Sequence, residues 1–211
     1  MTEPSNLTSV SSRLLRRIRG WGRGRVFVPR DLLDLATRET VDVTLHRLVR
    51  DGVIRRLGRG IYDYPKTHDR LGLLSPSADE IASAVSRSCG CSIVRSGAAA
   101  ANFLGLSTQV PARPLYLTDG SSRTLKIGKR SIQFRHASPS RMLGGDTTVG
   151  AVIRALRYLG RDAVTDAQID HLRSVLNDQD RSALLALKPQ VPTWVQRIIS
   201  RIVADDSTVA A

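Results

Sequence analysis

The chain has 211 residues, and 41% of them are hydrophobic, which is enough to form cores in two or three small domains. Its 32 lysines and arginines outnumber 19 acidic residues, giving a formal net charge of +13, and arginine supplies 28 of these cations. Because a guanidinium pairs with phosphate through two parallel hydrogen bonds, the excess is typical of a nucleic-acid partner, although a GC-rich genome also raises arginine content. No apolar run approaches the roughly 18 residues of a membrane span, and no signal core is present, which predicts a cytoplasmic protein.

The first part of the chain alternates short predicted elements. Residues 11–21 have the periodicity of a helix, residues 26–28 form a minimal strand, and Pro29 opens a short second helix. A third helix is predicted from a Thr37 N-cap to Arg50, and a hairpin follows it. This order is that of a winged helix-turn-helix, in which one helix lies in the DNA major groove while the hairpin touches flanking backbone.

The third helix is the predicted recognition helix. The side chains predicted on its DNA side are Arg38, Thr40, Thr44 and Arg47. Arg38 and Thr40 stand at the N-terminal end, where recognition helices reach base edges or phosphates. Glu39 and Asp42 either accept hydrogen bonds from cytosine amino groups or lie off the groove. A solvated helix face would carry polar residues at the same positions, so that alternative stays open.

The hairpin places Arg59 between Gly58 and Gly60, a tip that a simple chain reversal does not require. Arg59 is the predicted minor-groove or phosphate contact, because flanking glycines let the backbone turn tightly and approach the duplex. Arg55 and Arg56 point to opposite faces of their strand, so at most one of them contacts DNA. A plain solvated hairpin tip is the alternative.

The first helix offers two further arginines, Arg16 and Arg17, which are predicted to be phosphate contacts or part of a general basic surface. The sequence does not choose between these two roles.

The positive charge ends before the last third of the chain. Residues 1–75 hold 15 cations and 8 anions, residues 76–145 hold 9 and 3, and residues 146–211 hold 8 of each. Residues 66–76 resemble a linker, Ser77 begins a helix with a capping box, and short strands with a small-residue helix follow. A two-residue turn, Gly128-Lys129, is predicted between two of these strands. After Gly145 the pattern contains only amphipathic helices.

These patterns predict an α+β fold in three parts. The first is a winged helix-turn-helix DNA-binding domain over residues 9–66. An α+β module over residues 67–145 and a helical segment over residues 146–204 follow.

The sequence offers no catalytic constellation. Cys89 and Cys91 lie one residue apart, cannot build a disulfide framework, and are predicted to be buried thiols rather than half of a metal site. The four histidines are scattered without ligand spacing, and the basic part lacks a carboxylate cluster for a two-metal nuclease. We therefore expect no catalytic residue, no metal and no cofactor, and the chain is predicted not to be an enzyme.

Several stretches carry a resemblance to known families. TRETVDVTLHRLVRDGVIRRLGRGIY resembles the recognition helix and wing of winged-helix transcriptional repressors. RRLGRGIYDYP, SGAAAANFLGLSTQVPARPLYLTDG and SIQFRHASP resemble the AbiEi family over about residues 9–203. That family is the antitoxin and autorepressor half of type IV toxin–antitoxin and phage abortive-infection systems.

The resemblance implies a winged-helix domain that binds double-stranded DNA at inverted repeats upstream of its own operon. It also implies that the C-terminal part counters a nucleotidyltransferase toxin without obligatory direct contact. Carried over by position, the DNA face is Arg38, Thr40, Thr44, Arg47 and Arg59. Binding at inverted repeats fits a homodimer, and the C-terminal apolar stripes either supply its interface or form internal core.

Two alternatives to a repressor with an antitoxin role stay open. One is a protein-interaction module without a cognate toxin, whose basic domain gives only general affinity for nucleic acid. The other is a nucleic-acid enzyme, which the missing catalytic cluster disfavours.

Overall fold

The computed structural model describes residues 4–109, 111–128 and 130–204, and only the backbone of residues 4–9. Helices and small sheets are mixed along the chain, which confirms the predicted α+β class. The chain divides into two compact units: residues 1–91 with 125–132, and residues 92–124 with 133–211. The segment boundaries predicted after residues 66 and 145 fall inside these units.

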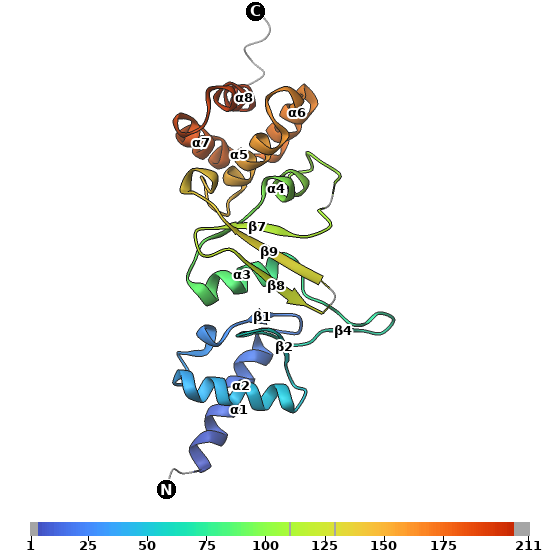
Figure 1. Ribbon diagram of the computed structural model, residues 1–211, viewed down its shortest axis with the longest axis vertical. Coiled ribbons are helices and arrows are strands. Elements are labelled where there is room, and N and C mark those ends of the chain that lie inside the picture. Colours follow the sequence, from blue (N-terminus) through green and yellow to red (C-terminus); the bar gives the residue numbers. More distant parts are fainter. Residues whose placement is uncertain (1–3, 110, 129, 205–211) are drawn as a thin grey trace, which may run out of the picture. The chain divides into compact units, whose positions relative to one another are not determined.

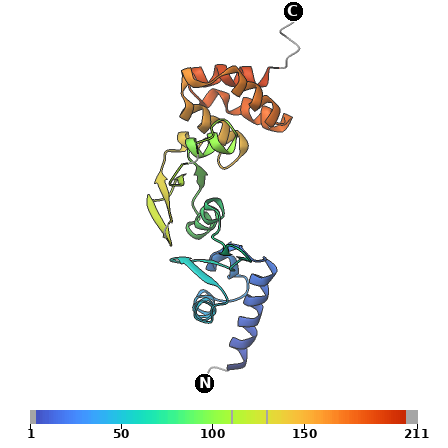
Figure 2. The same cartoon turned by 90° about the vertical axis from the view of Figure 1, so that its right-hand side faces the viewer.

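The first unit begins with helices that cross a small sheet. Its elements are α1 (Pro4–Gly20), β1 (Val26–Phe27), the 3-10 turn η1 (Pro29–Leu32), α2 (Arg38–Arg50), β2 (Arg55–Gly58) and β3 (Ile61–Asp63). The antiparallel sheet has the order β1-β3-β2. Helix α2 runs across α1, as the two views in Figures 1 and 2 show.

One hydrophobic core holds these elements together. Its buried members are Leu14, Ile18, Phe27, Leu32, Val41, Leu45, Leu48, Ile54 and Tyr62. The Phe27 ring lies 5.6 Å from the Trp21 ring and 6.0 Å from the Tyr62 ring, measured between centroids. Aromatic contacts at this distance add to the free energy gained from burial, so strand β1 ties α1 to the hairpin.

The predicted linker contains a small hairpin. Strand β4 (Thr67–His68) pairs antiparallel with β5 (Gly72–Leu73), and Gly72 adopts a positive φ of 68°. Leu71 and Leu73 are exposed. Because neither leucine faces a core, this part of the sequence has no apolar periodicity from which a hairpin could be recognised.

Helix α3 (Ala78–Cys89) packs on β1 and η1 of the first unit. Its Arg87 donates to the Asp31 carboxylate at 3.0 Å and to the Val26 carbonyl at 3.0 Å. The predicted capping box is confirmed: Ser77 Oγ accepts from Glu80 N–H at 3.2 Å, and the Glu80 carboxylate accepts from Ser77 N–H at 2.8 Å.

We expect Ser77→Ala to lower the free energy of unfolding by about 1 kcal/mol, because the Glu80 N–H loses its acceptor at the helix start. Urea unfolding followed by circular dichroism measures this loss. Ser83→Ala is the matched control, since Ser83 is an exposed residue inside the same helix. An equal loss in both variants would contradict the capping role.

A four-stranded sheet and one short helix follow in the chain, and residues 125–132 of this segment belong to the first unit. The elements of this segment are β6 (Ile93–Arg95), α4 (Gly97–Phe103), β7 (Leu115–Thr118), β8 (Arg123–Ile127) and β9 (Arg130–His136). The sheet order is β6-β7-β9-β8, with β6 antiparallel and β9 parallel to β7. The predicted Gly128-Lys129 turn includes Lys129, which lies outside the described residues.

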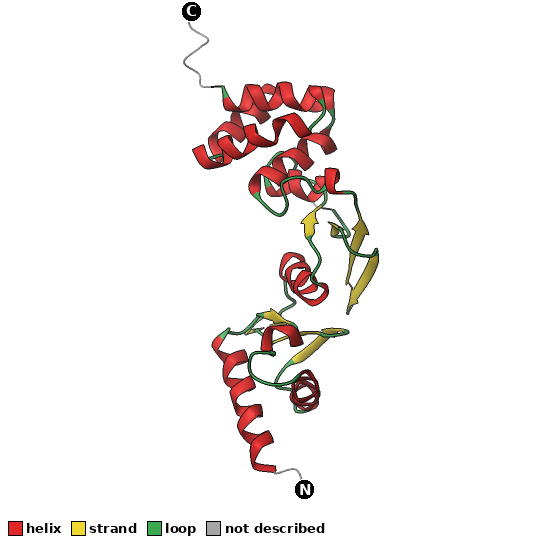
Figure 3. Cartoon of the chain, turned by 90° about the vertical axis from the view of Figure 1, so that its left-hand side faces the viewer, coloured by secondary structure: helices red, strands yellow, loops and turns green. Residues whose placement is uncertain are grey.

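The rest of the second unit is a helical layer (Figure 3). It contains α5 (Thr148–Leu159), α6 (Asp166–Val175), α7 (Asp178–Leu187) and α8 (Thr193–Val203), which match the predicted stripes. Short 3-10 turns are η2 (Pro139–Arg141), η3 (Arg161–Ala163) and η4 (Lys188–Gln190). The stripes pack on one another and on α4 in a shared core, so they are internal to this unit.

Helix α4 approaches α5 closely because its residues are small. A Cβ added at Gly97 would stand 2.6 Å from the Tyr158 Cβ and 2.8 Å from the Arg154 carbonyl oxygen. Atoms at these distances overlap, and a backbone carbonyl cannot rotate away. The small-residue run is therefore explained by helix packing.

Gly97→Ala is expected to destabilise the protein by about 1–3 kcal/mol, through overpacking between α4 and α5. Thermal unfolding measures the change. Gly20→Ala serves as control, because nothing lies within 4 Å of that position and its φ is not positive. If Gly97→Ala and Gly20→Ala had equal unfolding stabilities, α4 and α5 would be able to move apart at no cost in free energy.

Arg154 of α5 places a cation in the second core. Arg154 is only 4% exposed, and its Nη1 donates to the Leu143 carbonyl at 3.5 Å. Burial lowers the pKa of this guanidinium to about 10, while Asp146 raises it and Arg95 lowers it further. Arg154 therefore keeps its charge at neutral pH.

Candidate nucleic-acid interface

Helix α2 has one buried face and one exposed face. Val41, Leu45 and Leu48 pack into the first core. The exposed residues along the opposite face are Glu39, Val43, His46, Arg47 and Arg50. These positions recur at three- and four-residue spacing, so their side chains form one continuous strip over the 13-residue helix. We call this strip the α2 face.

The start of α2 carries an exposed ion pair. Arg38 Nε donates to the Asp42 carboxylate at 2.8 Å, across one helical turn. Thr40 is half-buried, and its hydroxyl lies 3.0 Å from the Thr37 hydroxyl. Thr37 occupies the N-cap position without a side-chain cap bond, since its hydroxyl is directed to Thr40 instead. An incoming phosphate or base would have to compete with Asp42 for Arg38.

Thr44 does not belong to the α2 face. The residue is only 3% exposed. It lies three residues after Val41 and four before Leu48, which places it on the buried side of the helix. The prediction that Thr44 contacts DNA is therefore wrong, because the residue is buried.

The β2–β3 hairpin presents Arg59 at its tip. Arg59 is exposed, and Gly60 next to it adopts a positive φ of 67°. Arg56 is exposed as well, and its Nε donates to the Gly58 carbonyl at 3.3 Å. The hairpin thus offers two accessible guanidinium groups.

Arg55, by contrast, is held inside the first unit. Its Nε donates to the Asp63 carboxylate at 3.0 Å, and its Nη2 donates to that carboxylate and to the Leu74 carbonyl. The Asp63 side chain is 1% exposed. A guanidinium that neutralises a buried carboxylate is not available to DNA, so Arg55 is also removed from the candidate set.

Tyr62 links the hairpin electrostatically to the start of α2. Burial raises the pKa of its phenol above the ordinary value, and Asp42 raises it too, whereas Arg56 and Arg38 lower it. The phenol is therefore neutral over the physiological range.

Helix α1 contributes an open groove to the first unit. The groove is lined by Arg13, Arg16, Arg17, Gly20, Trp21 and Leu35. Arg16 is exposed, and Arg17 donates to the Asp34 carboxylate at 2.8 Å. Arg16 is thus the more accessible of the two predicted α1 contacts.

The α2 face has three members that were not predicted from the sequence: Val43, His46 and Arg50. Val43 is 55% exposed, which is unusual for a valine in a helix that buries its other apolar residues. The signal was present in the sequence, because all three positions fall opposite Val41 and Leu48 on a helical wheel.

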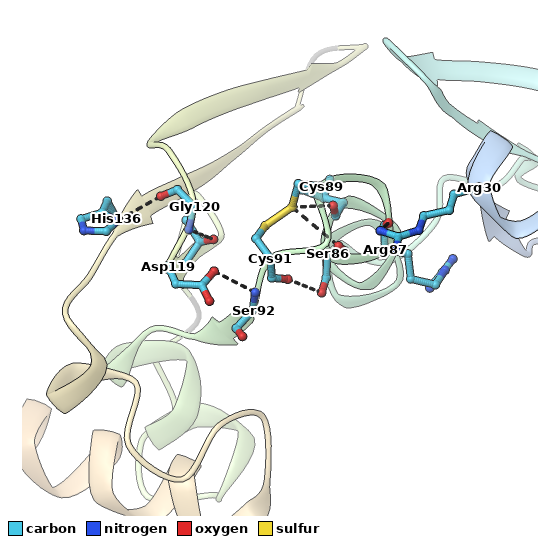
Figure 4. The surroundings of a disulfide bond; sticks show 11 residues. Arg30, Ser86, Arg87, Cys89, Cys91, Ser92, Asp119, Gly120 and His136 are labelled. Carbon is cyan, nitrogen blue, oxygen red and sulfur yellow. Dashed lines mark hydrogen bonds between the residues drawn. A yellow bond between two sulfur atoms is a disulfide. The ribbon is translucent and has the colours of Figure 1, made fainter. Parts of the chain in front are cut away.

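The two cysteines correct another expectation. Cys89 and Cys91 form a disulfide, and Cys89 is exposed while Cys91 is half-exposed (Figure 4). The prediction of buried thiols is therefore wrong. The physical reason is Gly90, whose positive φ of 66° turns the chain at the end of α3 and brings the two Cα atoms to 5.2 Å.

Over the part of the chain that the structure describes, no group of three histidine, cysteine, aspartate or glutamate side chains could hold a metal ion. In the same residues, no helix is long and apolar enough to cross a lipid bilayer.

The fold and this surface define an α+β protein whose first unit exposes a helix and a hairpin tip rich in arginine. Residues 13–184 match the model of a family described as "Family of unknown function (DUF6088)", and the chain belongs to that family. A search of curated proteins found no match.

Proposed function

We propose that this protein is a DNA-binding transcriptional autorepressor with a winged helix-turn-helix in residues 9–66, related to the AbiEi antitoxins. The observation that carries the proposal is the pairing of an exposed α2 face with an arginine hairpin tip in one unit. The buried face of α2 supports it, because Val41, Leu45 and Leu48 fix which side of the helix points outward.

The chemistry of the α2 face suits a major groove. Arginine forms bidentate hydrogen bonds with guanine O6 and N7, and an apolar side chain can contact the thymine methyl group. Arg47 and Val43 supply these two functions, while His46 and Arg50 add donors on the same strip. Arg56 and Arg59 of the hairpin are the proposed phosphate or minor-groove contacts.

An inverted repeat has two half-sites, and each half-site takes one recognition helix. Two copies of the chain would therefore bind one operator. The proposal therefore includes a pair of chains on the operator. The apolar stripes of the C-terminal helices do not supply the interface, because they are largely buried within the second unit.

The antitoxin role belongs to the proposal through the resemblance alone. The second unit would counter a nucleotidyltransferase toxin without needing to bind it directly. The role is tested by expressing the reading frame next to this gene in cells, with and without this protein. If the neighbouring product stops growth and this protein restores it, the antitoxin role is supported. Unrelieved toxicity, or a neighbouring frame without toxicity, would leave a repressor without an antitoxin function.

Fluorescence anisotropy tests DNA binding, with a duplex from upstream of the protein's own gene and a shuffled duplex of equal composition. At about 50 and 200 mM salt, a protein that makes 6–10 phosphate contacts loses roughly 10³–10⁵ in affinity. Tighter binding to the native duplex supports the repressor. Equal, weak and salt-sensitive binding to both duplexes contradicts it and favours a protein-interaction module with a merely basic surface.

A further inference from the structure

We propose that Cys89-Gly90-Cys91 is a reversible thiol–disulfide site that exchanges with monothiols of the glutathione class. The two bonded residues are the only cysteines in the chain. Thiol–disulfide exchange at this site therefore needs an outside thiol or disulfide, and the pair cannot reshuffle to another cysteine of the same chain.

The site is accessible. Cys89 is the last residue of α3 and is exposed together with Gly90, and Cys91 is half-exposed. Attack on a disulfide requires that a thiolate reach one sulfur in line with the bond. Cys89 (Figure 4) is the more exposed of the two residues, and its Sγ lies 3.1 Å from the Val85 carbonyl oxygen.

The bond contributes little to holding the fold. A cross-link stabilises a protein mainly by restricting its unfolded chain, and the restriction is smallest when the closed loop is shortest. Here the loop contains a single residue between the cysteines. Helix α3 is fixed without it, through its capping box and through the buried residues Ile81, Ala84 and Val85.

The thiol pair stays close when the bond is open. Ser86 Oγ donates to the Cys91 carbonyl at 2.6 Å, and Gly90 N–H donates to the Ser86 carbonyl at 2.8 Å. These two hydrogen bonds keep the turn after α3 in place without the sulfur–sulfur bond. Re-oxidation therefore closes an already formed turn and costs little chain entropy.

A guanidinium group lies beside the motif. Arg30 Nη1 stands 3.0 Å from the position of a Cβ on Gly90, and it donates to the Arg87 carbonyl at 3.3 Å. A nearby cation favours the thiolate, which is the reactive and leaving form. The C-terminal end of α3 opposes this effect, because its carbonyl dipoles disfavour negative charge.

The reaction balances with glutathione as the two-electron reductant. A glutathione thiolate attacks Cys89 Sγ, the sulfur–sulfur bond breaks, and Cys91 leaves as a thiolate that takes up a proton. A second glutathione thiolate attacks the glutathione sulfur of the mixed disulfide. Cys89 leaves as a thiolate and is protonated, and glutathione disulfide is the oxidised product.

The test is a redox titration of the full chain in buffers of reduced and oxidised glutathione, followed by acid quenching, alkylation and mass measurement. The titration varies the ratio of the squared concentration of reduced glutathione to the concentration of oxidised glutathione. When this ratio rises about a hundredfold, we expect the disulfide-bonded fraction of the protein to fall from about 90% to about 10%. Circular dichroism is expected to stay unchanged throughout. Reduction only after denaturation, or no disulfide in excess oxidised glutathione, would overturn the proposal.

Variants separate the site from its surroundings. In Cys91→Ser the intramolecular disulfide cannot form, so Cys89 is expected to accumulate as a mixed disulfide with glutathione in a folded chain. Absence of that adduct would contradict the accessibility of Cys89.

Arg30→Met is expected to slow alkylation of the reduced protein about threefold at neutral pH. Arg19→Met, an exposed arginine of α1, is the control. Equal rates in both variants would contradict the role of Arg30, and neither readout depends on DNA.

Discussion

Replacing Arg47 and Arg59 together by alanine is expected to abolish preferential binding to the native upstream duplex. Arg47 is exposed on the α2 face, where loss of a bidentate contact with guanine costs about 1–3 kcal/mol of discrimination. Arg59 is exposed at the hairpin tip, and its loss as a phosphate contact lowers the slope of log affinity against log salt by about 0.9. Anisotropy titrations at several salt concentrations measure both effects.

The double variant Arg161→Ala/Arg197→Ala is the matched control for two lost positive charges, because both arginines are exposed in the second unit. It is expected to leave the preference for the native duplex unchanged. If the Arg47→Ala/Arg59→Ala variant kept the full preference, the α2 face and the hairpin tip would not be the reading surface. If the control lost as much as that variant, only net charge would matter.

The second large effect is expected at the Arg55–Asp63 pair. Arg55→Met leaves the Asp63 carboxylate buried without its guanidinium partner, and such an uncompensated charge costs about 3 kcal/mol or more. Urea unfolding at neutral pH measures the lost stability. The double variant Arg55→Met/Asp63→Leu is expected to recover most of it, because replacing both charged partners by apolar residues removes the unpaired charge.

The Arg55→Met variant tests whether Arg55 has a structural role or contacts DNA. Under conditions where Arg55→Met is fully folded, its affinity for the native duplex is expected to equal that of the parent chain. A loss of affinity in the folded variant, or a failure of the second substitution to restore stability, would return Arg55 to the proposed interface.

Much of the local structure could be predicted from the sequence because local chemistry specifies it. The Ser77 capping box and the apolar stripes of the C-terminal helices each depend on residues within a few positions of one another. The exposure of Arg38, Arg47 and Arg59 also followed from periodicity and from the glycine-bounded turn.

Predictions were wrong where a partner distant in the sequence or a local turn decided the outcome. Arg55 is occupied by Asp63 across the hairpin and by Leu74 beyond it, contacts that no spacing in the sequence reveals. The polarity of Thr44 favours an exposed position, although its place on the helix puts it with the buried side chains. The one-residue spacing of the cysteines does not by itself reveal the left-handed Gly90 that allows the bond.

By itself, then, the sequence determined the α+β class, the helices with their caps and stripes, and a basic character confined to the first two-thirds of the chain. These features depend on intrinsic backbone preferences and on the hydrophobic period of each segment. Only the tertiary structure decided that α3 packs on β1 and η1 within the first unit and which arginines remain accessible. Those outcomes depend on packing and ion pairing between segments up to 61 residues apart, as between Arg87 and Val26, and such contacts leave no periodic trace along the chain.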